Sequence, residues 1–470
     1  MKKRLIYIFY FLIPLGTVMA QDPIKTLSAS QVAEIVNRFH PVAKQADLII
    51  EKAKADLTIS RGLFDPTLEN TNARKTFDGT EYYYYNRPEL AIPTWFGVEI
   101  RAGLEYLSGN RTDPTDTKGE TSYIGLSIPL AKNLLMDKRR AALQTARIFR
   151  DASAVEKRNI LNNLLQEALK TYWNWAARYQ TYRILSNAVT VNEKRVQLVK
   201  TAFRLGDRPA IDTAEALTQL QHFEVLQSEA WQEFQNAGLE LSLYLWTDKD
   251  QPYDLPETVL PADDLQGISS NAFVLPELTG LLDAARKNHP ELLLYNFKLD
   301  ALAVEKKLKF QDLLPDLNFK YNQLGKGYNL AKTVSSPLFE NNFQYGISMG
   351  IPLRLSQGRG EYRKARIKIT ETQLAQNQKQ LELENKVKAY FNELAALKNQ
   401  LVTQEKAWLN YAALQRGEET RFSAGESSLF LVNARENKTL EAFQKLQELK
   451  AKFFKAGIGI QWAAGILFNR

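Results

Sequence analysis

The clearest pattern along the chain is a strict alternation over residues 343–353 (FQYGISMGIPL). Apolar side chains occupy every second position, at Phe343, Tyr345, Ile347, Met349, Ile351 and Leu353. Small, polar or proline residues stand between them, at Gln344, Gly346, Ser348, Gly350 and Pro352. A period of two predicts a β-strand with one apolar face. A half-buried strand of a soluble protein has the same pattern, but about ten residues is also the length that a tilted strand needs to cross a bilayer.

The surrounding sequence favours a membrane strand. From about Gly360 the chain becomes helical and mostly polar for more than sixty residues. A similar arrangement occurs earlier, where the alternating runs Val98–Leu107 and 123–130 flank the polar loop Gly109–Glu120 and precede another long helical stretch. With a short strand at Leu317–Tyr321, these runs predict four membrane strands in the chain.

The stretch Thr67–Pro93 has no clear assignment from its pattern. It is strand-like and rich in tyrosine, but neither of its two faces is cleanly apolar. We therefore leave open whether it extends the first membrane strand or forms an extra hairpin at the rim of the sheet.

The helical stretch from Lys138 to about Arg204 contains no proline. Apolar residues recur in it every seven positions, at Leu161, Ala168, Trp175, Tyr182, Val189, Val196 and Phe203. This spacing is typical of a coiled-coil seam, and a helix of this span is roughly 100 Å long. Gly206 and Pro209 end it, and a return helix is predicted from about Ala210 to Leu245.

The second half of the chain repeats landmarks of the first. His40-Pro41 recurs 249 residues later as His289-Pro290. Along the long helices the offset becomes 219, so that Trp175 aligns with Leu394 and Gly206 with Gly425. A single register held over the long helix predicts an internal duplication.

These observations predict a mixed architecture of membrane β-barrel and long α-helical coiled-coil barrel. We divide the chain into a signal peptide (1–20), helices of the first repeat (21–66), its strands (67–130), its helical hairpin (131–247), an irregular equatorial segment (248–276), helices of the second repeat (277–315), its strands (316–353), its helical hairpin (354–456) and a C-terminal tail (457–470).

Composition limits the possible location and chemistry. The basic start at Lys2, the apolar run Leu5–Leu15 and Val18-Met19-Ala20 predict a secretory signal peptide. The absence of cysteine excludes disulfides and thiolate chemistry. No later stretch has about eighteen consecutive apolar residues, so any membrane crossing would have to use strands. The net charge of +8 is mild and spread along helices, which argues against a nucleic-acid partner.

No constellation of catalytic residues is recognisable. The three histidines, His40, His222 and His289, are far apart, and two of them precede prolines at predicted helix breaks. Gly358-Arg359-Gly360 lacks the lysine and the spacing of a phosphate-binding loop. We expect neither an enzyme nor a bound cofactor or metal.

Four strands cannot close a barrel, because the smallest closed membrane barrels have about eight. Open strand edges are not tolerated in lipid, so copies of the chain are expected to assemble. Two copies would supply eight strands, and three would supply twelve, with room for an aqueous lumen.

The chain resembles the TolC-like outer-membrane efflux proteins. The resemblance rests on the repeated order of helix, strands, long helix and return helix, on the His-Pro pairs, and on the turns Phe203–Asp212 (FRLGDRPAID) and Phe422–Val432 (FSAGESSLFLV). It implies a homotrimer in which one twelve-stranded barrel in the outer-membrane lipid continues into a helical tube in the periplasm. It also implies an exit duct for a tripartite efflux or type I secretion system, with a periplasmic adaptor and an inner-membrane transporter as partners.

In that family the glycine turns lie at the periplasmic tip, where the adaptor docks. The resemblance therefore assigns docking to six turn residues, which are Leu205, Gly206, Asp207, Ala424, Gly425 and Glu426. Asp212 matches an acidic position near the tip of family members. Leu431 and Ala434 stand where some members place aspartates that narrow the pore, and they are the pore-constriction candidates here.

Two other classes of protein remain to be compared. A soluble periplasmic coiled-coil scaffold or adaptor would explain the helices but not the alternating strands, and a diffusion porin would have many more strands and little helix. The exported substrate is not specified by any recognisable motif.

Overall fold

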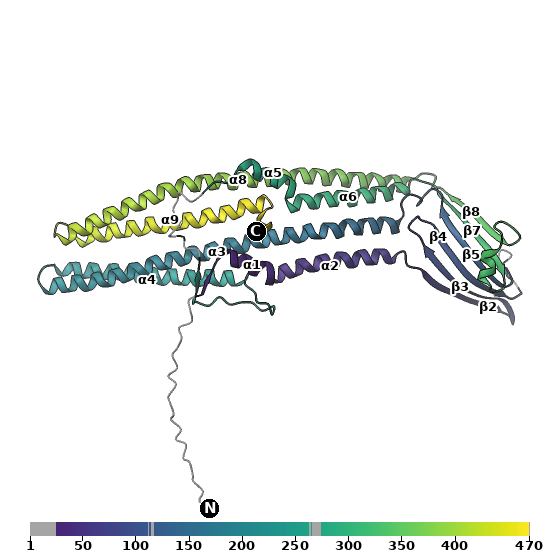
Figure 1. Ribbon diagram of the computed structural model, residues 1–470, viewed down its shortest axis with the longest axis horizontal. Coiled ribbons are helices and arrows are strands. Elements are labelled where there is room, and N and C mark those ends of the chain that lie inside the picture. Colours follow the sequence, from purple (N-terminus) through teal and green to yellow (C-terminus); the bar gives the residue numbers. More distant parts are fainter. Residues whose placement is uncertain (1–24, 111, 114–116, 263–264, 266–273, 470) are drawn as a thin grey trace, which may run out of the picture.

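The computed structural model describes residues 25–110, 112–113, 117–262, 265 and 274–469. The predicted signal peptide lies outside these residues. The molecule is elongated, with a layer of long helices that leads into a single β-sheet at one end (Figure 1). Among the described helices, none has a stretch both long and apolar enough to cross a membrane.

The sheet has six strands, where the sequence predicted four. Their order is β2 (Thr67–Phe77), β3 (Thr80–Pro93), β4 (Glu99–Ser108), β5 (Gly119–Pro129), β7 (Asp316–Lys326) and β8 (Phe343–Gly350), and every neighbouring pair is antiparallel. The two additional strands come from the tyrosine-rich stretch. They were missed because neither carries the apolar face that identifies a membrane strand.

The additional hairpin turns at Asp78-Gly79. Both residues have positive φ, 49° and 70°, as a two-residue hairpin turn requires. Pairing extends over both strands, from Thr67 opposite Ala91 to Phe77 opposite Thr80. Of the two possibilities left open, the extra hairpin is therefore correct, but it is an integral part of the sheet rather than an addition at its rim.

The predicted alternation of the other strands is confirmed by the register of the sheet. One row across four strands joins Ile100, Leu126, Tyr321 and Tyr345, and the row beside it joins Arg101, Gly125, Asn322 and Gln344. The first row belongs to an apolar face and the second to a polar face. All of β8 is exposed, so its apolar side chains are not covered by the rest of this chain.

The helices of the two halves have the same order and similar lengths. The first half contains α1 (Ala29–Phe39), α2 (Pro41–Gly62), α3 (Lys138–Arg204) and α4 (Ala210–Ser242), and the second contains α5 (Leu278–Asn288), α6 (Pro290–Gln311), α8 (Ser356–Ser423) and α9 (Leu429–Ala463). A short helix, α7 (Leu330–Ser335), lies between β7 and β8, and η2 (Leu467–Asn469) ends the described chain. The predicted tail from residue 457 is partly wrong, because α9 continues to Ala463 with buried apolar residues such as Ile460.

Both His-Pro pairs mark a break between two helices. The Nδ1 atom of His40 accepts a hydrogen bond from Val42 N at 3.2 Å, and that of His289 accepts one from Glu291 N at 3.2 Å. Each imidazole thus caps the helix that begins at the following proline. The interpretation of these histidines as structural residues is confirmed.

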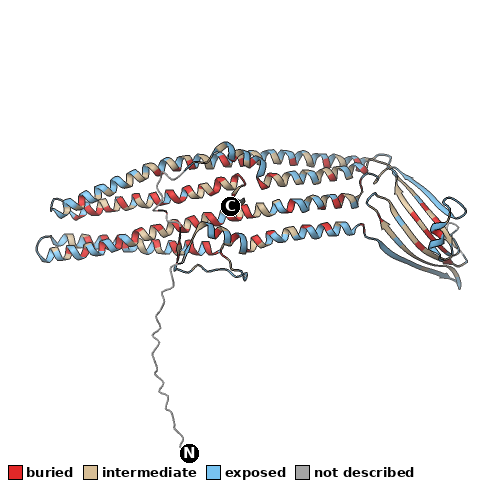
Figure 2. Ribbon diagram, in the orientation of Figure 1, coloured by how far each residue is buried: buried red, intermediate tan, exposed pale blue. Residues whose placement is uncertain are grey.

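Helix α3 lies at the centre of the apolar packing. Five of the seven predicted seam residues are buried, Tyr182 packs partly buried against a core cluster, and Phe203 near the tip is 45% exposed. Buried residues recur along the facing sides of the long helices in Figure 2. At mid-length, one side of α3 is covered by what we call the belt, which comprises α1, β1 (Lys25–Leu27) and β6 (Val259–Pro261).

Candidate functional site at the helical tips

Both long helical hairpins end in the same backbone turn, at the end of the molecule opposite the sheet (Figure 1). In the first turn, Gly206 N donates to Phe203 O at 3.0 Å and Asp207 N donates to Ala202 O at 3.0 Å. In the second, the corresponding bonds run from Gly425 N to Phe422 O at 3.1 Å and from Glu426 N to Arg421 O at 2.9 Å. This pattern is a Schellman motif, which satisfies the last carbonyls of a helix.

Glycine is required in both turns by the backbone conformation. Gly206 has φ of 82° and Gly425 has φ of 79°, a region that residues with a Cβ rarely adopt. No atom lies within 4 Å of the place where a Cβ would stand on either residue. The turns therefore need glycine for its φ angle and not for lack of space.

The six predicted docking residues lie together at these turns, and all are exposed. Leu205 is 72% exposed. Further apolar side chains are exposed nearby, namely Ile211 and Phe430, which the sequence analysis did not single out, and Phe203, the last predicted seam residue. The tips thus present a small apolar surface that a partner could cover.

Arg208 connects the two turns. Its guanidinium lies 4.0 Å from the ring centroid of Phe422, and its Nη2 donates to Phe422 O. Within its own hairpin it approaches Asp212 in the first turn of α4, with 3.9 Å between nitrogen and carboxylate oxygen. The predicted acidic residue Asp212 is therefore part of a link between hairpins and not a free charge at the tip.

A buried polar cluster joins α3 and α9 further from the tips. The guanidinium of Arg195 lies 2.6 Å and 3.1 Å from the two carboxylate oxygens of Glu436. Asn192 donates to the same carboxylate at 3.2 Å, and Arg195 also reaches the side-chain oxygen of Asn433 at 3.4 Å. The side chains of Arg195 and Glu436 are only 14% and 5% exposed. We call these four residues the clasp.

The clasp is expected to fix the alignment of the hairpins more than to add net stability. Burying two charges costs desolvation energy that roughly offsets their attraction, whereas removing one partner leaves an uncompensated charge and costs about 3–5 kcal/mol. Arg195 precedes Gly206 by eleven residues and Glu436 follows Gly425 by eleven. The clasp therefore lies at the same distance from both tips, roughly 16 Å along each helix.

The two pore-constriction candidates lie on the first turns of α9. Leu431 is 40% exposed, and its backbone N–H is capped by the Ser428 side chain at 3.4 Å. Ala434 is half-buried. Acidic side chains are present near these positions but are paired, as Glu418 accepts from the Ser427 hydroxyl and lies 4.0 Å from Arg435.

Arg208 and the clasp were missed in the sequence analysis. The available signal was an asparagine followed three residues later by a charged residue on each helix, at Asn192/Arg195 and Asn433/Glu436. Such pairs also occur on solvated helix faces, so the spacing alone does not identify partners 241 residues apart.

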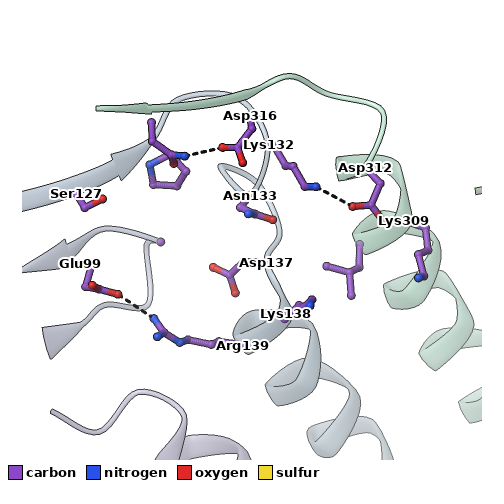
Figure 3. A pocket seen from close by; sticks show the side chains of 14 residues that line it. Glu99, Ser127, Lys132, Asn133, Asp137, Lys138, Arg139, Lys309, Asp312 and Asp316 are labelled. Carbon is purple, nitrogen blue, oxygen red and sulfur yellow. Dashed lines mark hydrogen bonds and ion pairs between the residues drawn. The ribbon is translucent and has the colours of Figure 1, made fainter. Parts of the chain in front are cut away.

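A second polar region lies where the sheet meets α3 and α6. It is a pocket of about 580 Å³ lined by residues of both signs (Figure 3). Lys132 lies 3.1 Å from Asp312, and Arg139 lies 3.5 Å from Glu99. Because these charges pair with one another, we interpret the pocket as a junction between the two parts of the molecule. Within the described residues, no group of three His, Cys, Asp or Glu side chains is arranged to hold a metal ion.

Comparison with known proteins shows which family and which solved structures the chain resembles. The sequence profile described as outer membrane efflux protein matches residues 281–463. Among solved structures, the outer membrane channel CmeC of Campylobacter jejuni superimposes with a TM-score of 0.64 at 15% identity, covering 93% of this chain and 86% of that chain. The fold is that of a TolC-like outer-membrane efflux protein.

Other structures agree with this TolC-like fold. The outer membrane protein VceC of Vibrio cholerae gives a TM-score of 0.64 at 14% identity, covering 93% of this chain and 96% of its own. The open-state MtrE outer membrane channel of Neisseria gonorrhoeae gives 0.64 at 13% identity, with 93% and 89% covered. A comparison with curated protein sequences finds no significant match. The family match confirms the predicted resemblance and the predicted location in the outer membrane.

Proposed function

We propose that the protein is the outer-membrane exit duct of an export system, assembled from three copies. The observation that carries this proposal is the sheet, which has one apolar face, two unpaired edges and a direct connection to helices of 67 and 68 residues. Unpaired edges are not tolerated in lipid, so the sheet has to be closed by further copies.

Closure through β8 of one copy and β2 of the next follows from the strand directions. Neighbouring strands alternate throughout the sheet, so its two edge strands run in opposite directions and can pair antiparallel. Three copies of a six-stranded sheet supply eighteen strands instead of the predicted twelve. A barrel of this size encloses an aqueous lumen.

The tips support the proposed partners. In the proposed system, a periplasmic adaptor meets the far end of the helices and connects the duct to an inner-membrane transporter. The exposed turn residues, Leu205, Gly206 and Asp207 with Ala424, Gly425 and Glu426, are the proposed docking surface. Leu431 and Ala434 on the first turns of α9 remain the proposed constriction.

The native mass of the protein extracted from outer membranes in mild detergent tests the assembly. A particle of three chains is expected, and a monomer in the soluble periplasmic fraction would instead favour a coiled-coil scaffold. The edge pairing has its own test, since the chain contains no cysteine. Chains that carry one cysteine on β2 and one on β8 at facing positions are expected to form disulfide-linked oligomers. Chains that carry one cysteine on β4 and one on β8 are not.

A further inference from the structure

A group of basic side chains gathers at mid-length on the side of the helices that faces away from the belt. Lys170 on α3, Lys452 and Lys455 on α9, and Arg178 on α3 belong to this group, which we call the basic cluster. Successive residues of a helix are about 100° apart, so the direction in which each points follows from residues whose contacts are known.

On α3, Tyr172 points to the belt, because its hydroxyl donates to Leu27 O at 3.0 Å. Lys170 and Asn174 stand two residues to either side of it, roughly 160–200° around the helix. On α9, Lys450 donates to Leu265 O at 2.8 Å. Leu265 packs in the same core cluster as Val259 of β6, so Lys450 points to the side of the belt. Lys452 therefore points the opposite way, and Lys455 lies about 140° from Lys450.

Contacts between helices confirm that this side is a continuous surface. Lys455 Nζ donates to the side-chain oxygen of Asn174 at 3.2 Å, which joins α9 to α3. Tyr390 of α8 reaches Lys170 across α9, with 3.4 Å between its hydroxyl and the ammonium nitrogen. Its ring crosses α9 at Gly459, where a Cβ would stand 2.4 Å from a ring carbon. Three helices thus contribute to one surface.

Few carboxylates balance the positive charge of the basic cluster. Within the described residues, Lys170, Lys452 and Lys455 form no ion pair with a carboxylate, and Arg178 is paired with Glu233 at 2.7 Å. Burial lowers the pKa of Lys455. The neighbouring positive charges of Arg178, Lys452 and Lys170 lower that pKa further, against the opposing charge of Glu240. Like charges held together with few carboxylates beside them are favourable for binding an anion.

We propose that the basic cluster lines the tunnel of the assembled duct and binds anionic groups, such as carboxylate or phosphate, of the substrates that pass through it. This inference rests on the proposed function, because only assembly around a common axis turns the surface opposite the belt toward a lumen. Three copies would then present a ring of positive charge at one level of the tunnel. Fixed charges of one sign in a narrow passage concentrate ions of the opposite sign.

Ion selectivity of the full-length protein in a planar lipid bilayer tests the proposal. The reversal potential in a potassium chloride gradient is expected to show a preference for chloride, and citrate is expected to block the current. In Lys170→Gln/Lys455→Gln, the preference should shift toward potassium and the block by citrate should weaken by roughly tenfold. Lys452→Gln, at an exposed position that tolerates the change, should shift both in the same direction by less.

Lys44→Gln is the matched control. Lys44 pairs with Asp250, which lies in the segment leading to β6. Its replacement removes one positive charge from each copy, as Lys452→Gln does, but not from the proposed lumen. Its selectivity should equal that of the unmodified protein. A pore that prefers potassium, or a pore whose ion preference is unchanged by the lysine substitutions, would contradict the anion site. Either result would leave the proposed duct unaffected. A protein that forms no pore overturns the duct and this inference with it.

Discussion

The helices of the two halves match, whereas the strands do not. Helices α3 and α8 have 67 and 68 residues, α4 and α9 have 33 and 35, and the shorter pairs are equal at 11 and 22 residues. The first half contributes four strands to the sheet, and the second contributes β7 and β8 together with the short α7.

This difference indicates that the two parts of the molecule are under different constraints. Helices packed side by side must have equal lengths if their tips are to meet at one level, because an extra turn in one would displace its tip by about 5 Å. A closed sheet requires only that every edge is paired, so strands can be added in hairpins. The identical turns at Gly206 and Gly425 reflect the requirement for equal helix length. The hairpin of β2 and β3 reflects the freedom to add strands in pairs.

The added hairpin also differs in chemistry from the strand at the other edge. Along β2, one side carries Asn70, Asn72 and Arg74, and the other carries Glu69, Thr71 and Lys75. On β8 one side is wholly apolar, with Ile347 63% and Met349 73% exposed. The two edges of the sheet are therefore distinct surfaces, as expected if unlike edges pair in the proposed assembly.

Removal of the added hairpin is expected to have the largest effect. Both ends of Thr67–Pro93 lie at the end of the sheet nearest the helices. Pro66 can therefore be joined to Thr94 to leave four strands in each copy. Because the diameter of a barrel grows roughly linearly with strand number, the barrel should become about a third narrower. Electron microscopy of the purified oligomer measures this. An unchanged diameter would show that β2 and β3 do not belong to the closed wall.

The clasp provides a second test of the difference between the halves. The first half has Arg195, whereas the aligned position of the second half has no arginine. Arg195→Met should destabilise the fold by about 3–5 kcal/mol, because Glu436 would remain buried without its partner. Replacement of both residues, Arg195→Met/Glu436→Leu, should restore most of the loss. Thermal unfolding followed by circular dichroism measures both. At the aligned position of the second half, Leu414 is 50% exposed, and Leu414→Ala should have a much smaller effect.

The two His-Pro caps should respond differently to pH. Burial lowers the pKa of both histidines. For His289 the charges of Lys386 and Lys379 add to this effect, and its pKa falls from 6.5 to about 4. The folded state therefore favours neutral His289. Its contribution is complete above pH 6.5 and is lost as the pH falls toward 4, by at most about 3 kcal/mol.

His289→Asn isolates this effect, because asparagine can cap the helix but does not titrate. Melting temperatures of detergent-solubilised protein should fall less between pH 7.5 and 4.5 in this variant than in the unmodified chain. His40→Asn should reduce the pH dependence by less. Equal behaviour of the two variants would contradict the assignment of the pH dependence to the buried His289.

The smallest expected effects concern the tips, where the halves should behave alike. Gly206→Ala and Gly425→Ala each place a Cβ in a left-handed conformation and should cost about 1–2 kcal/mol. Gly417→Ala is the control, since Gly417 lies within α8 and an added Cβ would meet no atom within 4 Å, so this change should be neutral or slightly stabilising. Thermal unfolding compares the three, and unequal costs at the two tips would show that their surroundings are not equivalent.

Much of the fold could be predicted from the sequence, but only where the pattern is regular. The heptad spacing of α3, the alternation of β8 and the two glycine turns are periodic or chemically distinctive. The helix and the turns are found where predicted, and β8 ends three residues before the end of the predicted strand, at Gly350. The stretch that forms β2 and β3 is strand-like but lacks an apolar face, so its pattern did not distinguish an extension of the first strand from an extra hairpin. The clasp and the basic cluster depend on which helices lie side by side, and that information is in the packing rather than in any local pattern.

The equal length of the long helices has a consequence for the cell. At 1.5 Å per residue, the 67 residues of α3 extend roughly 100 Å away from the sheet. If the sheet is fixed in one membrane, this distance sets where a partner anchored in the other membrane must reach to make contact. In that case the length of the helices determines how much of the compartment between the two membranes this chain spans. A partner anchored in the other membrane must be long enough to span the rest.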